Sequence, residues 1–385
     1  MKVLHVYRTY FPDSQGGLEE VIRQICLSTL EHGVDSRIFS LSVDPSPGFI
    51  DSDEGQIVRV KRTFEIASCG FCFGGLAEFR RQVEWADIVH YHFPWPFADI
   101  MHAVAGYPRP SIITYHSDVV RQRLLMVLYR PLMLHFLGTM DRIITTSPNY
   151  YATSDVLSRF SNKVDIIPIG IDRESYPVVT DESESLQRVE AEYGRGFFLF
   201  VGVLRYYKGL HILLEAIKDA PYRVVIVGSG AMESELREQA RELNLENVQF
   251  SGYVDDETKM ALFTLCRSVV FPSYMRSEAF GVTLLEGAMC GKPLISAEVG
   301  SGTSHINIHE RTGLVVTPGC PASLREAMDT VYHRPLVAEE MGKQAYARYQ
   351  ELFTGFSMGE SYAKVYEEVT SVRDPQRNVS LASTD

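Results

Sequence analysis

Two glutamates, Glu278 and Glu286, stand on either side of the start of a predicted helix. The helix is expected from Gly281 to about Cys290, and it is apolar nearly all round, which predicts that it is buried. A buried carboxylate needs hydrogen-bond partners, and a pair of sugar or ribose hydroxyls would suit Glu286. The N–H groups near Phe280 and Gly281 would lie at the positive end of the helix, which suits a diphosphate. Spacing alone leaves a second explanation open, a helix cap followed by a buried structural glutamate.

Two cations, Arg205 and Lys208, follow a predicted strand that ends at Val201. A helix is expected to begin near Gly209, so the cations would lie at the carboxyl end of the strand, where ligands bind in open α/β sheets. Positive charge there would stabilise the negative charge that develops on a departing nucleoside diphosphate. For Arg205, a surface ion pair is the alternative.

A histidine, His116, follows the predicted strand 111–115 and stands close to Asp118. At the carboxyl end of a strand it could hydrogen-bond a sugar hydroxyl or polarise a reacting group. A lone histidine is more often a polar residue with structural partners, and that alternative stays open for His116. His90 and His92 are expected to be structural.

Glycines mark two further loops. Gly16 and Gly17 stand between the first predicted strand and the first predicted helix, and Gly228 follows a strand in the second half. Such loops let backbone N–H groups approach a phosphate closely. The spacing is not that of the Gly-x-Gly-x-x-Gly dinucleotide fingerprint, and a plain tight turn is the alternative for Gly16 and Gly17.

Strand and helix patterns alternate along the chain, which predicts α/β layers with parallel sheets. The length of 385 residues suits two domains, and proline and glycine within 168–172 mark the expected crossing between them. In the first half, strands are predicted at 2–7, 36–41, 57–60, 88–92, 111–115, 142–146 and 164–168. In the second half, they are predicted at 197–201, 222–227, 248–250, 268–271, 293–296 and 313–316.

Composition narrows the class of protein. A formal net charge of −12 argues against a protein that coats nucleic acid, because phosphate binding needs a basic surface. Residues 1–7 become polar too early for a signal peptide, and no stretch is long and apolar enough to cross a membrane. Six cysteines in a chain of this length do not make a disulfide framework, so a cytoplasmic protein is expected.

The segment 278–286 resembles the Glu-x7-Glu motif of retaining glycosyltransferases of the GT-B fold, family 4. The resemblance covers nearly the whole chain, because further segments match in order and spacing, namely 16–17, 114–118, 167–172, 201–209 and 312–315. It implies an α/β GT-B fold, in which two Rossmann-like domains face each other across a cleft.

The resemblance also implies where the domains lie. Residues 1–170 plus 355–375 would form the acceptor-binding domain, with the last helix, about 358–369, crossing back to it. Residues 171–354 would form the domain that binds the nucleotide-sugar donor. Residues 376–385 are expected to be a disordered tail.

In that family the first glutamate of the motif contacts the donor sugar and the second contacts the ribose. The resemblance assigns these roles to Glu278 and Glu286, and it matches His116 to the histidine of the acceptor domain. Lys208 fits the family's pattern of a cation at the diphosphate. Arg205 fits less well, because Val203 stands where an arginine usually follows the glycine.

Three further residues are carried over on the donor side. Gly228 lies in a loop that resembles the family's nucleotide-side loop. Tyr253 and Val254 match the place where backbone groups meet the base.

The family retains the anomeric configuration of the sugar. Beyond Asp118 no second carboxylate stands out on the acceptor side, so a two-carboxylate mechanism is not favoured. The expected reaction is attack on the same face, with the leaving diphosphate oxygen taking the proton of the acceptor. It needs no metal and no cofactor beyond the nucleotide-sugar co-substrate.

Two motifs are interpreted as incidental. Asp51-Ser52-Asp53 imitates the Asp-x-Asp metal site of a different glycosyltransferase fold, but it sits in a predicted loop. Cys69 and Cys72 have redox spacing, but no thioredoxin-like unit is predicted around them.

The donor is expected from two stretches, 119–122 and 301–304, that resemble family members acting in bacterial surface polysaccharide synthesis. GDP-mannose is the first expectation, GDP-rhamnose the second and a UDP-sugar the third. The acceptor would be a glycan or a polyprenyl-linked sugar, as in O-antigen and lipopolysaccharide synthesis.

The apolar stretch 124–136 is interpreted as a core helix kinked at Pro131. The alternative is an interfacial surface that meets a lipid-linked acceptor, with the protein peripheral on the cytoplasmic face of the membrane.

Two other classes of protein stay open on the same architecture. A UDP-sugar 2-epimerase would need carboxylates on both sides of the cleft, and a non-catalytic scaffold would have lost the site residues.

Overall fold

The computed structural model describes residues 1–66, 69–106, 109–118 and 123–373. The stretch 119–122, on which the donor expectation partly rests, and the tail 376–385 lie outside these residues. The chain divides into two compact units. Unit 1 is Met1–Gly170 together with the C-terminal helix α14 (Gly355–Arg373), and unit 2 is Ile171–Thr354.

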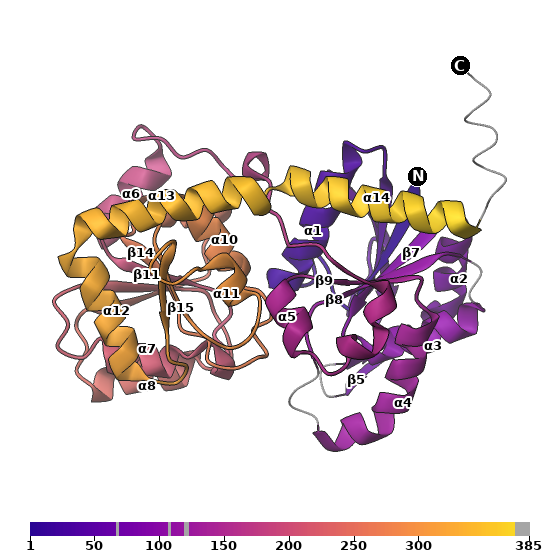
Figure 1. The fold of residues 1–385 in the computed structure, drawn as a ribbon, viewed down its shortest axis with the longest axis horizontal. Coiled ribbons are helices and arrows are strands. Elements are labelled where there is room, and N and C mark those ends of the chain that lie inside the picture. The colour runs from indigo at the N-terminus through magenta and orange to yellow at the C-terminus, as the bar shows by residue number, and fades with distance from the viewer. Residues whose placement is uncertain (67–68, 107–108, 119–122, 374–385) are drawn as a thin grey trace. The chain divides into compact units, whose positions relative to one another are not determined.

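The described part of unit 1 contains an eight-stranded sheet in the order β10-β9-β8-β7-β1-β2-β4-β3, with helices packed around it (Figure 1). Neighbouring strands are parallel except β3 and β4, which form an antiparallel hairpin. The strands of this sheet are β1 (Lys2–Val6), β2 (Asp35–Ser42), β3 (Phe49–Ser52), β4 (Gly55–Lys61), β7 (Ile88–Phe93), β8 (Ser111–Tyr115), β9 (Arg142–Thr145) and β10 (Val164–Ile166). A separate antiparallel hairpin pairs β5 (Phe64–Ile66) with β6 (Cys69–Phe71).

The helices of unit 1 include α1 and α14, which pack against each other (Figure 1). A Cβ on Gly359 of α14 would clash with the carbonyl oxygen of Ser28 on α1, so the close approach requires glycine there. Except for α4, the other described helices of unit 1 are shorter than α1 and α14. The bounds are α1 (Gly17–Leu30), η1 (Phe73–Gly75), α2 (Leu76–Trp85), α3 (Pro96–Ala105), α4 (Arg123–Thr139), α5 (Pro148–Thr153) and η2 (Leu157–Lys163).

Unit 2 contains a six-stranded, fully parallel sheet in its described residues, in the order β13-β12-β11-β14-β15-β16. Its strands are β11 (Phe198–Val201), β12 (Val224–Val227), β13 (Val248–Gly252), β14 (Ser268–Phe271), β15 (Leu294–Ala297) and β16 (Gly313–Val316). Its helices are η3 (Arg173–Ser175), α6 (Glu184–Tyr193), η4 (Tyr206–Lys208), α7 (Leu210–Ala216), α8 (Glu233–Glu242), α9 (Asp256–Leu265), α10 (Val282–Met289), α11 (Thr303–Ile306), α12 (Pro321–His333) and α13 (Pro335–Leu352).

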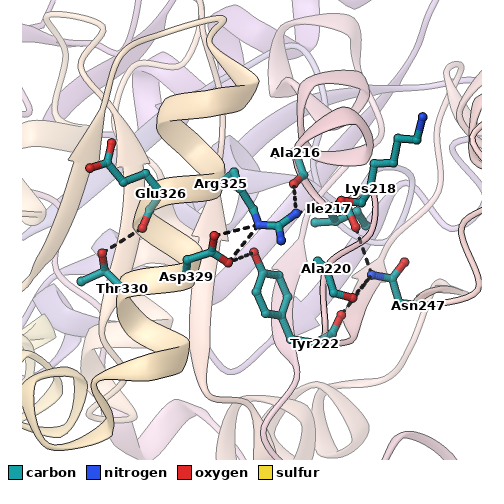
Figure 2. A network of polar contacts seen from close by, with 10 residues as sticks. All are labelled: Ala216, Ile217, Lys218, Ala220, Tyr222, Asn247, Arg325, Glu326, Asp329 and Thr330. Carbon is teal, nitrogen blue, oxygen red and sulfur yellow. Dashed lines mark hydrogen bonds and ion pairs between the residues drawn. The ribbon is translucent and has the colours of Figure 1, made fainter.

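A polar network lies at the amino end of β12 and β13 (Figure 2). Arg325 on α12 donates from Nε to both carboxylate oxygens of Asp329 over 2.9 Å, and from Nη1 to the carbonyls of Ala216 and Lys218. The amide of Asn247 donates to the carbonyls of Ile217, Ala220 and Tyr222. These bonds tie α12 and the segment after α7 to this end of the sheet.

Candidate active site

Two loops of unit 2 meet at the carboxyl end of its sheet. One follows β11 and the other follows β14. Gly209, in the first loop, has a φ of +71°, and a Cβ there would clash with the carbonyl oxygen of Pro272 in the second. The N–H of Tyr274 donates to the carbonyl of Tyr207 over 3.1 Å. These backbone contacts bring the predicted cation of one loop to the predicted carboxylate of the other.

The ammonium of Lys208 lies 2.5 Å from Oε2 of Glu278, and the two side chains are only 12% and 10% exposed. The hydroxyl of Ser273 donates to the same oxygen over 3.0 Å. The ammonium also lies 4.6 Å from the centre of the Phe271 ring, which is a favourable cation–π distance. Two residues predicted from separate motifs therefore form one nearly buried ion pair.

This pair has capacity left for a ligand. A carboxylate accepts about four hydrogen bonds, so Glu278 can take sugar hydroxyls in addition to its two donors. The ammonium carries three protons, so Lys208 can bind a phosphate oxygen while it stays on Glu278. Removing either partner would leave the other charge buried and uncompensated.

Glu286 lies on α10 and is 5% exposed. Its Oε1 is 3.0 Å from the ammonium of Lys259 on α9, which also pairs with Asp256 over 2.8 Å. Burial acts to lower the pKa of Lys259, but the carboxylates of Glu286 and Asp256 outweigh it and hold that pKa above its usual value. Sequence analysis missed Lys259, which stands soon after the matched segment Tyr253-Val254. Contact of Glu286 with a ribose stays a prediction.

The helix that follows Glu278 begins at Val282 and ends at Met289, close to the predicted bounds. Gly281 caps it with a φ of +96°, which favours glycine, and Phe280 before it is buried. The expected diphosphate contact by N–H groups near Phe280 and Gly281 stays a prediction.

Gly228 is required by close packing at the end of β12. Its φ is +121°, and a Cβ there would clash with the carbonyl oxygen of Gly202, after β11. Its N–H donates to the carbonyl of Gly252 over 2.8 Å. Backbone crowding alone therefore explains this glycine, and its contact with a nucleotide stays a prediction.

Three other predicted donor-side residues lie in loops at the same end of the sheet. Arg205 is exposed and makes no side-chain ion pair within the described part of the chain, so the surface ion pair considered for it is absent there. Tyr253 directly follows β13 and is 70% exposed, which leaves an aromatic face open to a base. Val254 beside it is half-buried.

In unit 1, Gly16 and Gly17 lie at the start of α1. Gly16 has extended backbone, and a Cβ there would lie 2.8 Å from Oε2 of Glu19, the end of a side chain. A Cβ on Gly17 would meet open space, so neither backbone conformation nor backbone crowding demands glycine at these positions. Sequence analysis missed Glu19, whose Oε1 accepts hydrogen bonds of 2.9 Å from Thr9 and Ser14. This glutamate stands three residues after the cap, where a capping box has its acidic residue. A phosphate bound at Gly16 and Gly17 would meet the negative charge of Glu19. The predicted contact of these glycines with a phosphate stays a prediction.

His116 follows β8 in unit 1 and is 5% exposed. Its Nε2 lies 3.0 Å from Nδ1 of His92, a residue expected to be structural. Burial lowers the pKa of His116 to about 3, so its ring is neutral near pH 7. Asp118 beside it accepts hydrogen bonds from Tyr115 and Ser154.

The motifs interpreted as incidental have structural surroundings. Asp51 lies in the β3–β4 hairpin, where it accepts a hydrogen bond from Gln56. Cys69 and Cys72 are free thiols, and burial raises the pKa of both, that of Cys72 to about 12. Thiols that stay protonated are poor redox nucleophiles.

Family models match both halves of the chain. Residues 15–175, nearly all of them in unit 1, match the model described as Glycosyltransferase Family 4. Residues 181–348, in unit 2, match the model described as Glycosyl transferases group 1.

Two relatives named as glycosyltransferases are similar to this chain over nearly their whole length. A D-rhamnosyltransferase, WbpZ, of Pseudomonas aeruginosa is 50% identical over 92% of this chain and 92% of that protein. An O-antigen chain mannosyltransferase C of Escherichia coli is 42% identical over 95% of this chain and 98% of that protein. Among solved structures, a sucrose-phosphate synthase from Thermosynechococcus elongatus superposes with a TM-score of 0.80 over 96% of this chain and 99% of that chain, at 22% identity.

The structural likeness supports the fold, and the two relatives together with the two family models support the activity. They confirm the predicted pair of Rossmann-like domains and the predicted enzyme class. The chain belongs to the family 4 glycosyltransferases of the GT-B fold and is an enzyme that transfers a glycosyl group.

Proposed function

We propose that this enzyme transfers a mannose-configured hexose from a GDP-sugar to a glycan or polyprenyl-linked acceptor in O-antigen synthesis, with retention, in the cytoplasm. The observation that carries the catalytic part is the ion pair between Lys208 and Glu278 at the carboxyl end of the unit 2 sheet. It places a cation for the leaving diphosphate within hydrogen-bonding distance of a carboxylate for the sugar hydroxyls.

The relatives support two donors that differ by one hydroxyl. D-Rhamnose is 6-deoxy-D-mannose, and the names of the two relatives give rhamnosyl and mannosyl transfer. A site whose polar groups bind the O6 hydroxyl would reject the deoxy sugar by about 10⁴-fold, whereas an apolar pocket rejects an added hydroxyl only by about 10²-fold. The ratio of kcat/KM for GDP-mannose and GDP-D-rhamnose therefore reports how the site treats position 6.

Retention would follow from attack on the face that the diphosphate leaves. The ammonium of Lys208 would stabilise the charge on that diphosphate, and its departing oxygen would take the acceptor's proton. Glu278 would hold Lys208 in place and bind the sugar. The neutral ring of His116 would serve as a hydrogen-bond partner of a hydroxyl.

A donor panel tests the proposal. The purified enzyme is offered GDP-mannose, GDP-D-rhamnose, UDP-glucose and UDP-N-acetylglucosamine, with thermal shift for binding and NMR for the anomeric configuration of the product. We expect binding and turnover of a GDP-sugar with an α-linked product from an α-linked donor. Faster turnover of a UDP-sugar would overturn the donor assignment, an inverted product would overturn retention, and epimerised UDP-sugar would support the isomerase instead. If no nucleotide sugar bound at all, the non-catalytic scaffold would be the remaining interpretation.

An exposed apolar stretch of α4 supports the lipid-linked acceptor. Val127 and Leu128 are 72% and 81% exposed, whereas Met133 and Phe136 further along are buried. The helix therefore combines the two interpretations of this stretch, a core-packed end and an uncovered apolar end. None of the described helices is both long and apolar enough to span a bilayer. We propose that the uncovered end lies in the membrane interface.

Flotation with liposomes tests this contact. The wild type should float with anionic vesicles, and the double variant Val127→Ser/Leu128→Ser should remain at the bottom. Leu336 of unit 2 is 80% exposed, so Leu336→Ser is a matched control that should float like the wild type. A wild type that never floats, even with anionic vesicles, would exclude the membrane contact.

A further inference from the structure

A row of histidine rings crosses the sheet of unit 1 beneath His116. His5 lies on β1, His92 lies on the neighbouring strand β7, and His116 follows β8. The rings of His5 and His92 stack at 5.4 Å with 20° between their planes, and those of His92 and His116 stack at 5.3 Å with 19°. All three residues are buried, with exposures of 0%, 1% and 5%.

The rings form a continuous hydrogen-bonded chain. Nδ1 of His5 lies 3.1 Å from Nε2 of His92, and Nδ1 of His92 lies 3.0 Å from Nε2 of His116. Burial lowers the pKa of His5 and of His116 to about 3 and that of His92 well below its usual value. Each ring is then neutral and carries one N–H, so every bond of the chain must point the same way.

The far end of the chain sets that direction. Nε2 of His5 is buried and has no hydrogen-bond partner among the residues that the structure describes. If the protons pointed from His116 towards His5, this nitrogen would be an orphaned N–H. If they point from His5 towards His116, it is an unused lone pair. Orphaned buried N–H groups are the rarer of the two in proteins, so the second direction is favoured.

We propose that His5 and His92 are positioning residues that fix His116 as its Nδ1–H tautomer. Nε2 of His116 accepts the bond from His92, and the remaining N–H makes His116 a hydrogen-bond donor. His116 therefore binds a hydroxyl oxygen of a substrate and does not act as a general base. This role rests on the proposed function, and it agrees with a reaction in which the leaving diphosphate takes the proton.

His90, which also lies in this cluster, behaves differently. Its Nδ1 lies 2.8 Å from the hydroxyl of Tyr366 on α14, and its Nε2 lies 2.7 Å from the hydroxyl of Thr114. Both nitrogens are thus used, and the residue links the C-terminal helix to the sheet. His90 fits the structural role expected for it and does not belong to the chain that ends at His116.

A metal ion is the competing occupant. The ligand nitrogens of His5, His90 and His92 lie within 4.8 Å of one another. An ion would have to break the bonds that these rings already make, and the group contains no carboxylate to offset two buried positive charges. The tautomer chain is therefore the better account, and metal binding becomes an outcome of the test.

The test is a long-range ¹H–¹⁵N correlation spectrum of the full chain labelled with ¹⁵N-histidine, in which His116→Gln identifies the signals of His116. We expect the Nδ1–H tautomer in the wild type. His92→Phe keeps a stacked ring but removes the bond, so His116 should become a mixture of tautomers. An Nε2–H tautomer of wild-type His116 would overturn the proposal, and so would one equivalent of zinc that shifts His5, His90 and His92. Once the His116 signals are assigned, the wild-type spectrum decides even where His92→Phe fails to fold.

Kinetics add a matched pair of variants at His5, the end of the histidine chain that lies farthest from His116. His5→Leu removes the donor to His92, whereas the amide of His5→Asn can replace Nδ1–H. His92→Phe and His5→Leu should each lower kcat/KM about fivefold, as expected for one neutral hydrogen bond, and His5→Asn should recover most of the loss. Equal losses in both His5 variants would contradict the positioning role. The spectra need no substrate, so their result stands apart from whether the proposed transfer reaction is found.

Discussion

The two ends of the unit 2 sheet hold their polar groups in different ways. At the amino end, Arg325 and Asn247 donate mostly to main-chain carbonyls, which are fixed by the fold (Figure 2). At the carboxyl end, Lys208 is held by the side chain of Glu278. Carbonyl partners saturate a donor within the protein, whereas a side-chain ion pair can share its charges with a ligand. The difference separates a network that stabilises the fold from one that can do chemistry.

Lys208→Ala breaks the carboxyl-end network and should have the largest effect. It removes the cation from the leaving diphosphate and leaves Glu278 buried without its partner, so kcat should fall by about 10²-fold or more. Glu278→Ala should lose as much, because it frees Lys208 and removes the carboxylate for the sugar. Initial rates with saturating donor and acceptor measure both.

Lys343 supplies the control for this prediction. It is 64% exposed and pairs with Glu339 on the surface of the same unit, so Lys343→Ala should stay within about twofold of the wild type. If the Lys208 and Glu278 variants turn over as fast as this control, the pair has no part in transfer.

Arg325→Met breaks the amino-end network and should have the opposite profile. The free energy of unfolding should fall by about 1–3 kcal/mol, because two carbonyls lose the Arg325 donor and Asp329 keeps only the hydroxyl of Tyr222, while kcat stays at the wild-type value. Urea unfolding and initial rates on the same preparation measure the two quantities. Arg195, an exposed partner of Glu190, is the control, and Arg195→Met should leave the free energy of unfolding close to that of the wild type. A large loss of kcat in folded Arg325→Met would erase the contrast between the two ends.

The sequence predicts the parallel strands well, because their continuous apolar runs reflect burial on both faces. β12 and β14, for example, are buried at every position. It misses β3, β5 and β6, which are only three or four residues long and contain few fully buried residues, so they lack a continuous apolar run. Such short antiparallel strands depend on their hairpin partners.

Site residues divide along a similar line. His116 directly follows a strand, and Lys208 and Glu278 lie in the segments that connect a strand to the next α-helix, so the parallel order of the sheets predicts the edge at which each lies. The side-chain partners of Glu286 and His92 do not follow from the local sequence pattern. Lys259 reaches Glu286 from another helix, and His5 reaches His92 only because β1 and β7 are neighbours in the sheet. Such contacts depend on sheet order and register.

Asp99→Asn extends the comparison to a buried carboxyl of unit 1 and should have the smallest effect. Asp99 is 2% exposed, its Oδ2 accepts a hydrogen bond from Tyr129 over 2.7 Å, and its Oδ1 has no partner among the described residues. Burial raises the pKa of Asp99 to about 8, so this carboxyl keeps its proton and is uncharged at neutral pH. Glu278, by contrast, is paired with the ammonium of Lys208.

The sign of its pH dependence follows from that proton. Between pH 4 and pH 8 the folded protein binds one more proton at Asp99 than the unfolded chain does, so stability falls as pH rises. Near neutral pH the wild type should lose about 1 kcal/mol per pH unit relative to Asp99→Asn, which cannot ionise. Urea unfolding at pH 5.5, 6.5 and 7.5 measures this difference. Parallel pH profiles for the two proteins would mean that Asp99 is ionised in the folded protein and has a cation or water partner there. The buried carboxylates Asp99 of unit 1 and Glu278 of unit 2 would then both be charged and paired.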